Sequence, residues 1–215
     1  MAVMVNLHNH SHYSVLDGII KIDEVMTQVK GYGQKAAALT DHGNMFGAME
    51  FLSEAKKAEI KPIFGIESYI APQNRFIHDK EDKYHHIVLL AKDLQGFKNL
   101  NKLASIGYLE GFYYKPRIDK DVLAEYREGI VVLTACIGGE IPRMILSENE
   151  AGLKSALDYY IDTFGKENFF LEVQDHGLTE EKIVIQKMIE ISKKTGLKMV
   201  APADAHYLKK EDAKL

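Results

Sequence analysis

The sequence predicts an α/β fold in which short parallel strands alternate with amphipathic helices around a single barrel. Short apolar runs recur along the chain, and stretches with apolar residues at helical spacing separate them. This alternation is typical of parallel βα units and argues against an antiparallel sandwich. A chain of 215 residues with 46% hydrophobic residues can bury the core of one such barrel. We therefore expect one domain over residues 1–215.

Seven apolar runs are predicted to form the strands, and polar residues follow most of them. The runs cover residues 3–7, 36–40, 61–66, 87–91, 130–134, 169–173 and 199–203. Downstream of them stand His8, Asp41 with His42, Glu67, Cys136, Asp175 with His176, and Asp204 with His206. His86 is the exception, because it precedes its strand at residues 87–91. Since the carboxyl ends of parallel strands meet at one mouth of a barrel, we expect these side chains to converge there.

Helices are expected between the strands. Three stripes of apolar residues have helical spacing: Ile22, Val25, Met26 and Val29, then Ala48, Phe51, Leu52 and Ala55, and later Val184, Met188 and Ile191. Further helices are expected over residues 93–105, 119–126 and 150–164. The polar stretch at residues 73–83 predicts a mobile loop.

Composition limits the compartments and partners that we expect. The net charge of -4 gives no globally basic surface, so nucleic acid would need a local patch or partner domains. A single cysteine excludes an internal disulfide framework and suits a reducing compartment. The sequence shows no secretory signal pattern and no apolar stretch of the roughly 20 residues that span a bilayer. We therefore expect a cytoplasmic protein that does not contact a membrane.

The residue types at the expected mouth indicate metal-assisted chemistry. His8 and His10, two positions apart on an extended segment, can face one site, and a carboxylate can bridge two cations through its two oxygens. Imidazole, carboxylate and one thiolate suit zinc, manganese or iron better than calcium. Two or three such ions would generate a hydroxide nucleophile, bind a phosphate and neutralise the leaving oxygen. This combination predicts phosphoester hydrolysis.

Several motifs closely resemble the PHP (polymerase and histidinol phosphatase) domain family over essentially the whole chain. They are His8-Asn9-His10-Ser11, Leu16-Asp17-Gly18, residues 39–44 (Leu-Thr-Asp-His-Gly-Asn), Gly65-Ile66-Glu67, residues 110–118 (Glu-Gly-Phe-Tyr-Tyr-Lys-Pro-Arg-Ile) and Asp204-Ala205-His206-Tyr207. Within the family they are most similar to the amino-terminal PHP domains of C-family replicative polymerases, the alpha subunits of bacterial DNA polymerase III. The resemblance implies a distorted, seven-stranded (β/α)7 TIM-like barrel with three divalent metal ions at its mouth, magnesium being less expected than zinc, manganese or iron.

The resemblance also implies nine metal ligands, and each position has the residue type that the family uses. They are His8, His10, Asp17, His42, Glu67, His86, Cys136, Asp204 and His206. Cys136 alone could be a small buried apolar side chain, and Asp17 could cap a helix. His86 is preferred to His85 because neighbouring strand residues face opposite ways. Pro202 and Ala203 depart from the Thr-Asn that is usual in the polymerase branch, and loss of an outer hydrogen-bonding group weakens metal sites about 10 to 100-fold.

Weaker candidates surround this set. We group Asp41 and His176 as candidate catalytic residues: Asp41 is expected to orient a ligand, and His176 to contact phosphate or act as an acid. Lys115 and Arg117 could bind a DNA backbone, although a Lys-Pro-Arg loop is also an ordinary solvated turn. Arg143 is a similar candidate for a phosphate contact.

Three functions from different classes remain, and the first is favoured. It is 3′-5′ exonuclease proofreading at the primer 3′ end of DNA, with metal-activated hydroxide attacking the terminal phosphodiester. The second is a small-molecule phosphomonoesterase similar to histidinol phosphatase. The third is a structural domain that docks a separate proofreading exonuclease subunit. The resemblance implies the remainder of the polymerase alpha subunit as a partner, because the palm, thumb and fingers of such a polymerase, and with them its polymerase site, are absent from these 215 residues.

Overall fold

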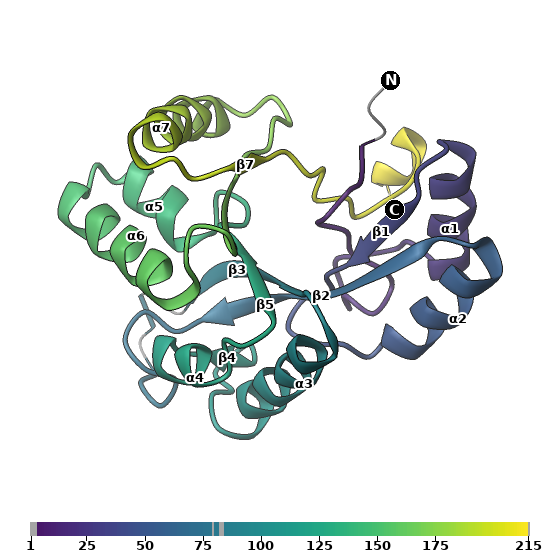
Figure 1. Cartoon of the computed structure of the whole chain (residues 1–215), viewed down its shortest axis with the longest axis horizontal. Coiled ribbons are helices and arrows are strands. Elements are labelled where there is room, and N and C mark those ends of the chain that lie inside the picture. Colours follow the sequence, from purple (N-terminus) through teal and green to yellow (C-terminus); the bar gives the residue numbers. More distant parts are fainter. Residues whose placement is uncertain (1–3, 79, 82–83, 215) are drawn as a thin grey trace.

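The computed structural model describes residues 4–78, 80–81 and 84–214, and its strands form one curled, mostly parallel sheet surrounded by helices (Figure 1). The strands are β1 (Ala36–Leu39), β2 (Lys61–Ile70), β3 (His85–Ala91), β4 (Arg117–Ile118), β5 (Ile130–Leu133), β6 (Phe169–Glu172) and β7 (Met199–Val200). Their order is β1-β2-β3-β5-β6-β7, with β4 paired to β2. This architecture agrees with the predicted α/β fold and with a distorted barrel.

The helices lie outside the sheet, and most were predicted. They are α1 (Ile22–Gly31), α2 (Ala48–Ala58), α3 (Leu94–Leu109), α4 (Lys120–Glu125), α5 (Glu140–Leu146), α6 (Glu150–Phe164), α7 (Thr179–Thr195) and the 3-10 helix η1 (Lys210–Lys214). Asp93 and Asp119, expected as first residues of helices, instead accept hydrogen bonds from the first turns of α3 and α4. None of the helices in the described ranges has the length and apolar character that a membrane crossing requires.

Strand β3 corrects the expectation of an all-parallel sheet. It runs antiparallel to β2 on one side and to β5 on the other, whereas the other described pairs are parallel. The first residues of β3 therefore lie at the same end of the sheet as the last residues of β2. This direction explains why His86 precedes its strand while the other candidate ligands follow theirs.

The strand predicted at residues 3–7 was wrong for its described part. Met4 to Leu7 form no strand, and Val3 lies outside the described residues. Polar backbone partners hold the segment instead, because the Ala38 N–H donates to the Asn6 carbonyl (3.2 Å) and the His10 N–H donates to the Ala205 carbonyl (2.9 Å). The segment thus lies between β1 and the chain that follows β7.

Three short elements escaped prediction: β4, α5 and the 3-10 helix η1. Strand β4 has only two residues, too few for an alternating pattern. Helix α5 contains Pro142 in its first turn, where a missing N–H costs no helical hydrogen bond, and so the proline did not mark a helix end. Within the predicted loop at residues 73–83, the described residues form only bends and turns.

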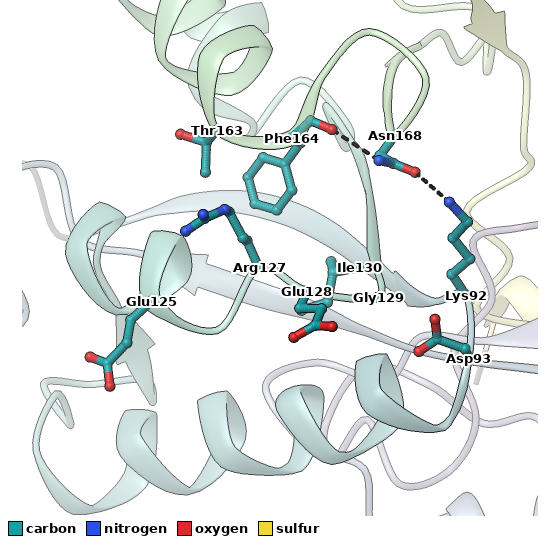
Figure 2. A pocket seen from close by; sticks show the side chains of 10 residues that line it. All are labelled: Lys92, Asp93, Glu125, Arg127, Glu128, Gly129, Ile130, Thr163, Phe164 and Asn168. Atoms are coloured by element: carbon teal, nitrogen blue, oxygen red, sulfur yellow. Dashed lines mark hydrogen bonds between the residues drawn. The ribbon is translucent and has the colours of Figure 1, made fainter.

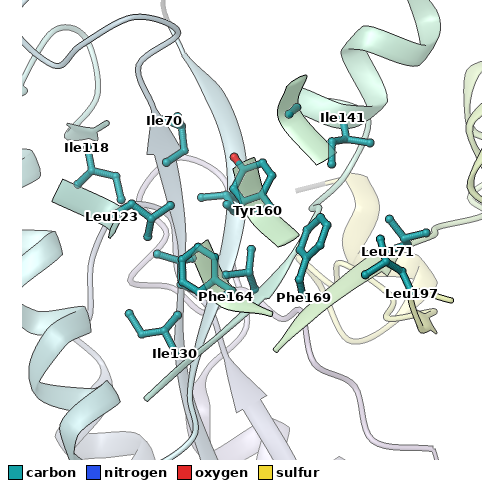
Figure 3. Packing of buried hydrophobic residues seen from close by; sticks show 14 of the residues in the cluster. Ile70, Ile118, Leu123, Ile130, Ile141, Tyr160, Phe164, Phe169, Leu171 and Leu197 are labelled. Atoms are coloured by element: carbon teal, nitrogen blue, oxygen red, sulfur yellow. The ribbon is translucent and has the colours of Figure 1, made fainter. Parts of the chain in front are cut away.

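The core confirms the predicted apolar stripes. All four residues of the first stripe are buried in α1, and Phe51 and Ala55 are buried in α2. A larger cluster fills the space between the sheet and helices α3 to α7, and Phe169 and Leu171 of β6 are fully buried in it (Figure 3). Burial of each such side chain stabilises the fold by about 1.5–3 kcal/mol. The sheet is therefore a rigid base for the residues at its mouth.

Candidate metal centre

All nine candidate ligands converge at one end of the sheet. The segment at residues 6–10 supplies His8 and His10, and the loop before α1 supplies Asp17. His42 follows β1, Glu67 lies in β2, and His86 lies at the start of β3. Cys136 follows β5, and Asp204 and His206 follow β7. Isolated parallel bridges join His42 to Glu67 and Asn9 to Ala205, so neighbouring segments are held in register where the ligands lie.

Glu67 lies at the centre of the cluster. Its Oε2 is 2.6 Å from His42 Nδ1 and 3.4 Å from His10 Nε2. Its Oε1 is 2.8 Å from His86 Nδ1 and 3.5 Å from His8 Nε2. Burial opposes ionisation of this carboxyl group, but the charge and hydrogen bonds of the surrounding histidines outweigh it and hold the pKa of Glu67 well below its ordinary value. One buried carboxylate thus faces four imidazoles.

Asp204 forms a second point of convergence. Its Oδ1 lies 3.2 Å from His8 Nε2 and 3.1 Å from His10 Nε2. Burial raises the pKa of Asp204, but hydrogen bonding to His10 and the charge of His8 lower it to about 2. Burial also lowers the pKa of His10 to about 4, so this ring is neutral near pH 7 and keeps a nitrogen lone pair for a ligand.

The remaining candidates form the solvent-facing side. His42 Nε2 lies 2.9 Å from Asp17 Oδ2 and 3.4 Å from His206 Nε2. The rings of His42 and His206 both stack on His10, at centroid distances of 4.1 and 4.2 Å. The Asp17 side chain is 54% exposed and that of His206 is 26% exposed. The cluster is therefore accessible from the side of Asp17 and His206.

Cys136 lies at the other edge of the cluster. Its Sγ is 3.7 Å from His86 Nδ1 and accepts a hydrogen bond from the Gly138 N–H. Burial, and then the negative charges of Glu67 and Asp204, raise the pKa of the thiol well above its ordinary value. The thiolate form that binds metals therefore needs a positive charge beside it.

Two observations show that these side chains fit divalent cations. Three groups have ligand atoms within 4.8 Å of one another: His8, His10 and Asp204; His10, His42 and His206; and Glu67, His86 and Cys136. In addition, three buried atoms of the cluster lack a hydrogen-bond partner: His42 Nδ1, Glu67 Oε2 and His8 Nε2. The first two lie 2.6 Å apart, but not in the geometry of a hydrogen bond. Such atoms are costly to bury unless something binds them, and a cation can bind several at once.

Asp41 lies behind the cluster. Its Oδ1 accepts hydrogen bonds from the Ser11 N–H and the Ser14 hydroxyl, each at 2.7 Å. The Ser14 Oγ in turn lies 3.0 Å from His10 Nδ1 and accepts the His42 N–H at 3.0 Å. The structure thus places Asp41 where it orients two histidines through Ser14. Sequence reasoning missed Ser14, because a serine after a His-x-His motif gives no distinctive signal.

His176 is engaged at both ring nitrogens. Nε2 donates to the Ala203 carbonyl (3.0 Å), and Nδ1 pairs with Glu181 Oε1 (2.7 Å). The carbonyl of Ala203, and then Glu181, raise the pKa of His176 against a smaller effect of burial. The Ala203 N–H also donates to Asn6 Oδ1 at 2.8 Å, so backbone contacts hold the segment in which Pro202 and Ala203 depart from the usual pattern. This arrangement favours an anchoring role for His176 over an acid role.

The three basic candidates have different positions. Arg117 is 1% exposed, and its guanidinium donates to the carbonyls of Gly111, Ile77 and Arg75 at 2.9–3.0 Å. It therefore holds two loops together, and the expected contact with DNA does not fit its burial. Lys115 is half-buried, with Nζ 5.5 Å from the centre of the Tyr69 ring. Arg143 is exposed on α5.

A separate polar pocket of about 430 Å³ lies at the opposite end of the sheet (Figure 2). It is lined by Lys92, which follows the last residue of β3, and by Ile130, the first residue of β5. Lys92 Nζ donates to Asn168 Oδ1 at 3.2 Å across the pocket, and acidic side chains balance its basic ones. None of the nine candidate ligands lines it.

Comparison with known proteins gives a family and close relatives. A model of the PHP domain family matches residues 6–176. The DNA polymerase III alpha subunit of Borreliella burgdorferi is 47% identical over 212 residues, and that of Thermus aquaticus is 44% identical over 215 residues. Each match covers 97% of this chain and 18% of the relative, so the chain spans about a fifth of the length of these proteins.

Solved structures share the fold at low sequence identity. A candidate metal-dependent phosphoesterase from Bifidobacterium adolescentis has a TM-score of 0.61 and 13% identity, covering 94% of this chain and 87% of the other. A two-domain protein from Bacteroides vulgatus, described as containing a PHP-like metal-dependent phosphoesterase predicted from its sequence, has a TM-score of 0.57 and 17% identity, covering 94% of this chain and 51% of the other. At such identities the likeness concerns the fold alone.

Proposed function

The chain belongs to the PHP domain family, and from this premise we propose that it is a metal-dependent phosphoesterase that removes nucleotides from the 3′ end of DNA. The observation that carries the proposal is the complete set of nine ligand-type side chains at one end of the sheet. Eight of them fall into the three groups with ligand atoms within 4.8 Å, and the ninth, Asp17, lies 2.9 Å from His42.

Each group is proposed to hold one divalent ion. His8, His10 and Asp204 form one site; His10, His42 and His206 with Asp17 form a second; Glu67, His86 and Cys136 form a third. Zinc, manganese or iron suits this mixture of nitrogen, oxygen and sulfur donors. Ions held there supply positive charge that polarises a phosphoester and lowers the pKa of water.

The chain's own residues determine how a phosphoester enters the site. Asp17 and His206 form the open side of the cluster, because their side chains are 54% and 26% exposed. Glu67 lies beneath them, 1% exposed, and keeps four histidines facing one another. We place the scissile phosphate on the side of Asp17 and His206, because the opposite side is closed by the apolar interior of the sheet.

Lys115 is the proposed contact to the DNA backbone. Its ammonium lies over the face of Tyr69, and the Tyr69 ring lies 6.1 Å from His42 and 5.3 Å from His86. A cation on the ring that neighbours His42 and His86 is suited to the phosphate next to the scissile one. Arg143 on α5 remains a weaker proposal for the same role.

The relatives support a place for the activity. Because they are alpha subunits of DNA polymerase III, we place this chain beside the polymerase part of such a subunit, in the cytoplasm, where a primer 3′ end would reach it. Phosphoester hydrolysis beside a polymerase, at the primer 3′ end, would remove misincorporated nucleotides, and so we propose proofreading as the function. A separate proofreading exonuclease subunit is a further proposed partner.

A 3′-exonuclease assay tests the proposal. A labelled primer-template with a mismatched 3′ end is incubated with the chain and manganese or zinc, and chelator and His10→Ala serve as controls. Shortening that is lost in both controls is the expected result. Hydrolysis of nitrophenyl phosphate or histidinol phosphate without shortening of DNA would instead support the phosphomonoesterase function. Bound metal without either activity would support a structural role.

A further inference from the structure

A buried glutamate outside the nine candidate ligands contacts one of them. Glu172, the last residue of β6, is 1% exposed, and its Oε1 lies 2.7 Å from His8 Nδ1. Gln174 Nε2 donates to the same oxygen, also at 2.7 Å. Sequence reasoning missed Glu172, although a carboxylate inside an otherwise apolar strand was the signal that could have found it.

The strand directs Glu172 into the barrel. Successive residues of a strand face opposite sides, so Phe169 and Leu171 pack into the outer core while Phe170 and Glu172 face inward. The Glu172 N–H donates to the Thr134 hydroxyl at 2.8 Å, which fixes the backbone at this point. The carboxylate is therefore held toward His8 by regular secondary structure.

The hydrogen bonds around Glu172 determine where the His8 ring carries its proton. Since the Gln174 amide donates to Glu172 Oε1, this oxygen is an acceptor, and His8 Nδ1 must donate to it. The amide nitrogen of Gln174 also lies 3.5 Å from His8 Nδ1, but the carboxylate contact is 0.8 Å shorter (3.5 against 2.7 Å) and dominates. A histidine must be neutral to bind a metal ion, and in the neutral ring the contact to Glu172 places the proton on Nδ1 and the lone pair on Nε2.

His8 Nε2 faces the cluster. It lies 3.2 Å from Asp204 Oδ1 and 3.5 Å from Glu67 Oε1, and it is buried without a hydrogen-bond partner. We propose that Glu172 is the positioning residue that keeps His8 in its Nδ1-protonated form and thereby presents Nε2 to the metal ion held with His10 and Asp204. This inference rests on the metal binding in the proposed function.

The chain offers a control away from the cluster. Glu128 lines the pocket at the opposite end of the sheet, which none of the nine candidate ligands lines. Glu172→Leu removes the acceptor, Glu172→Gln retains an acceptor without the charge, and Glu128→Leu removes a carboxylate far from the candidate ligands. Each variant is compared with the unchanged chain of 215 residues.

Two measurements test the inference. Long-range ¹H–¹⁵N NMR of the histidine rings in the zinc-loaded chain reports which nitrogen of His8 binds the ion, and titration with zinc against a competing chelator reports the affinity of each bound ion. Glu172→Leu is expected to mix the two forms of His8 and to weaken one ion about 10 to 100-fold. Glu172→Gln is expected to keep the Nδ1 proton with a smaller loss, and Glu128→Leu is expected to leave metal affinity unchanged.

Unchanged zinc affinity in Glu172→Leu, or an equal loss in Glu128→Leu, would overturn the inference and leave the proposed function standing. If Glu172→Leu does not fold, Glu172→Gln decides, because a shift of its His8 proton to Nε2 contradicts the inference. Absence of zinc binding in the unchanged chain would overturn the proposed function and this inference together.

Discussion

At the scale of single residues, metal chemistry could be predicted because several histidines and carboxylates lie at the ends of recognisable strands, whereas the full set of nine ligands, Asp17 included, was implied by the resemblance to the PHP domain family. His42, Glu67 and Asp204 stand at such positions, and the structure brings them together. The residues behind them could not be predicted in the same way. Ser14 and Glu172 act through His10 and His8, and those partners lie 4 and 164 positions away in the sequence. Only the fold shows which histidine each one contacts.

Glu67→Gln tests the hub of the cluster. Loss of a residue that only hydrogen-bonds to a metal ligand lowers metal affinity about 10 to 100-fold. Because Glu67 itself faces four histidines, its replacement by the neutral amide is expected to lower zinc affinity by more than this. Competition with a chelator measures the loss, and Glu128→Gln, in the pocket at the opposite end of the sheet, is the control. A Glu67→Gln chain with the zinc affinity of Glu128→Gln would contradict the assignment.

Arg117 and Lys115 are neighbours in sequence with different expected effects. Arg117→Leu removes the guanidinium that donates to three carbonyl groups and is expected to lower the free energy of unfolding by about 3 kcal/mol. Lys115→Leu is expected to change it by less than about 0.5 kcal/mol. Urea denaturation measures both changes. Equal effects on stability would refute the structural role of Arg117.

His176 and Glu181 predict a dependence of stability on pH. The pKa of His176 is raised, so its contribution is complete below the ordinary histidine value of about 6.5 and is lost as pH rises through the folded pKa. The pKa of Glu181 is lowered, so its contribution is complete above the ordinary value of about 4.3 and is lost as pH falls through the folded pKa. The destabilisation caused by His176→Ala should therefore be largest near pH 5–6 and decrease toward pH 8. Melting curves across this range check the trend, and a destabilisation that increases toward pH 8 would contradict it.

At the scale of elements, sequence periodicity located strands and helices but not strand direction. The alternation of β and α segments favoured parallel strands throughout, but β3 proved antiparallel to β2, and the described residues between the two strands form no crossover helix. The position of His86 before its strand was the sign of this reversal. The segment at residues 6–10 showed a different limit, because the apolar run at residues 3–7 predicted a strand that did not form in its described part. Side chains such as Asn9 bind neighbouring carbonyl groups there in place of a regular ladder of backbone hydrogen bonds.

The packing of α3 gives a prediction for Gly96. Alanine normally stabilises a helix by up to about 1 kcal/mol over glycine. A Cβ at Gly96, however, would lie 1.9 Å from the Gly129 carbonyl oxygen, so Gly96→Ala is expected to destabilise the fold by about 2 kcal/mol. Gly31 in α1 has open space around it, and Gly31→Ala is expected to be neutral or stabilising. Thermal melts compare the two variants, and stabilisation by both would show that α3 does not pack on Gly129 as described.

At the scale of the whole molecule, the fold brings together residues from both ends of the chain. His8 and Asp204 are 196 positions apart in the sequence, yet His8 Nε2 lies 3.2 Å from Asp204 Oδ1. The site therefore forms only when the sheet has curled. The cluster contains three carboxylates, five imidazoles and a thiol; His8, His10 and Glu67 are buried, five others are half-buried, and metal ions would offset the cost of burying these groups. Metal binding and folding are therefore expected to be coupled.

The central claim is that the nine side chains form one multinuclear metal centre. Elemental analysis of the purified chain, loaded with manganese or zinc and freed of excess ions, tests it most directly. The account predicts three divalent ions per chain in the unchanged protein, fewer in Glu67→Gln, and none after dialysis against chelator. Fewer than one ion per chain at saturating metal would contradict it.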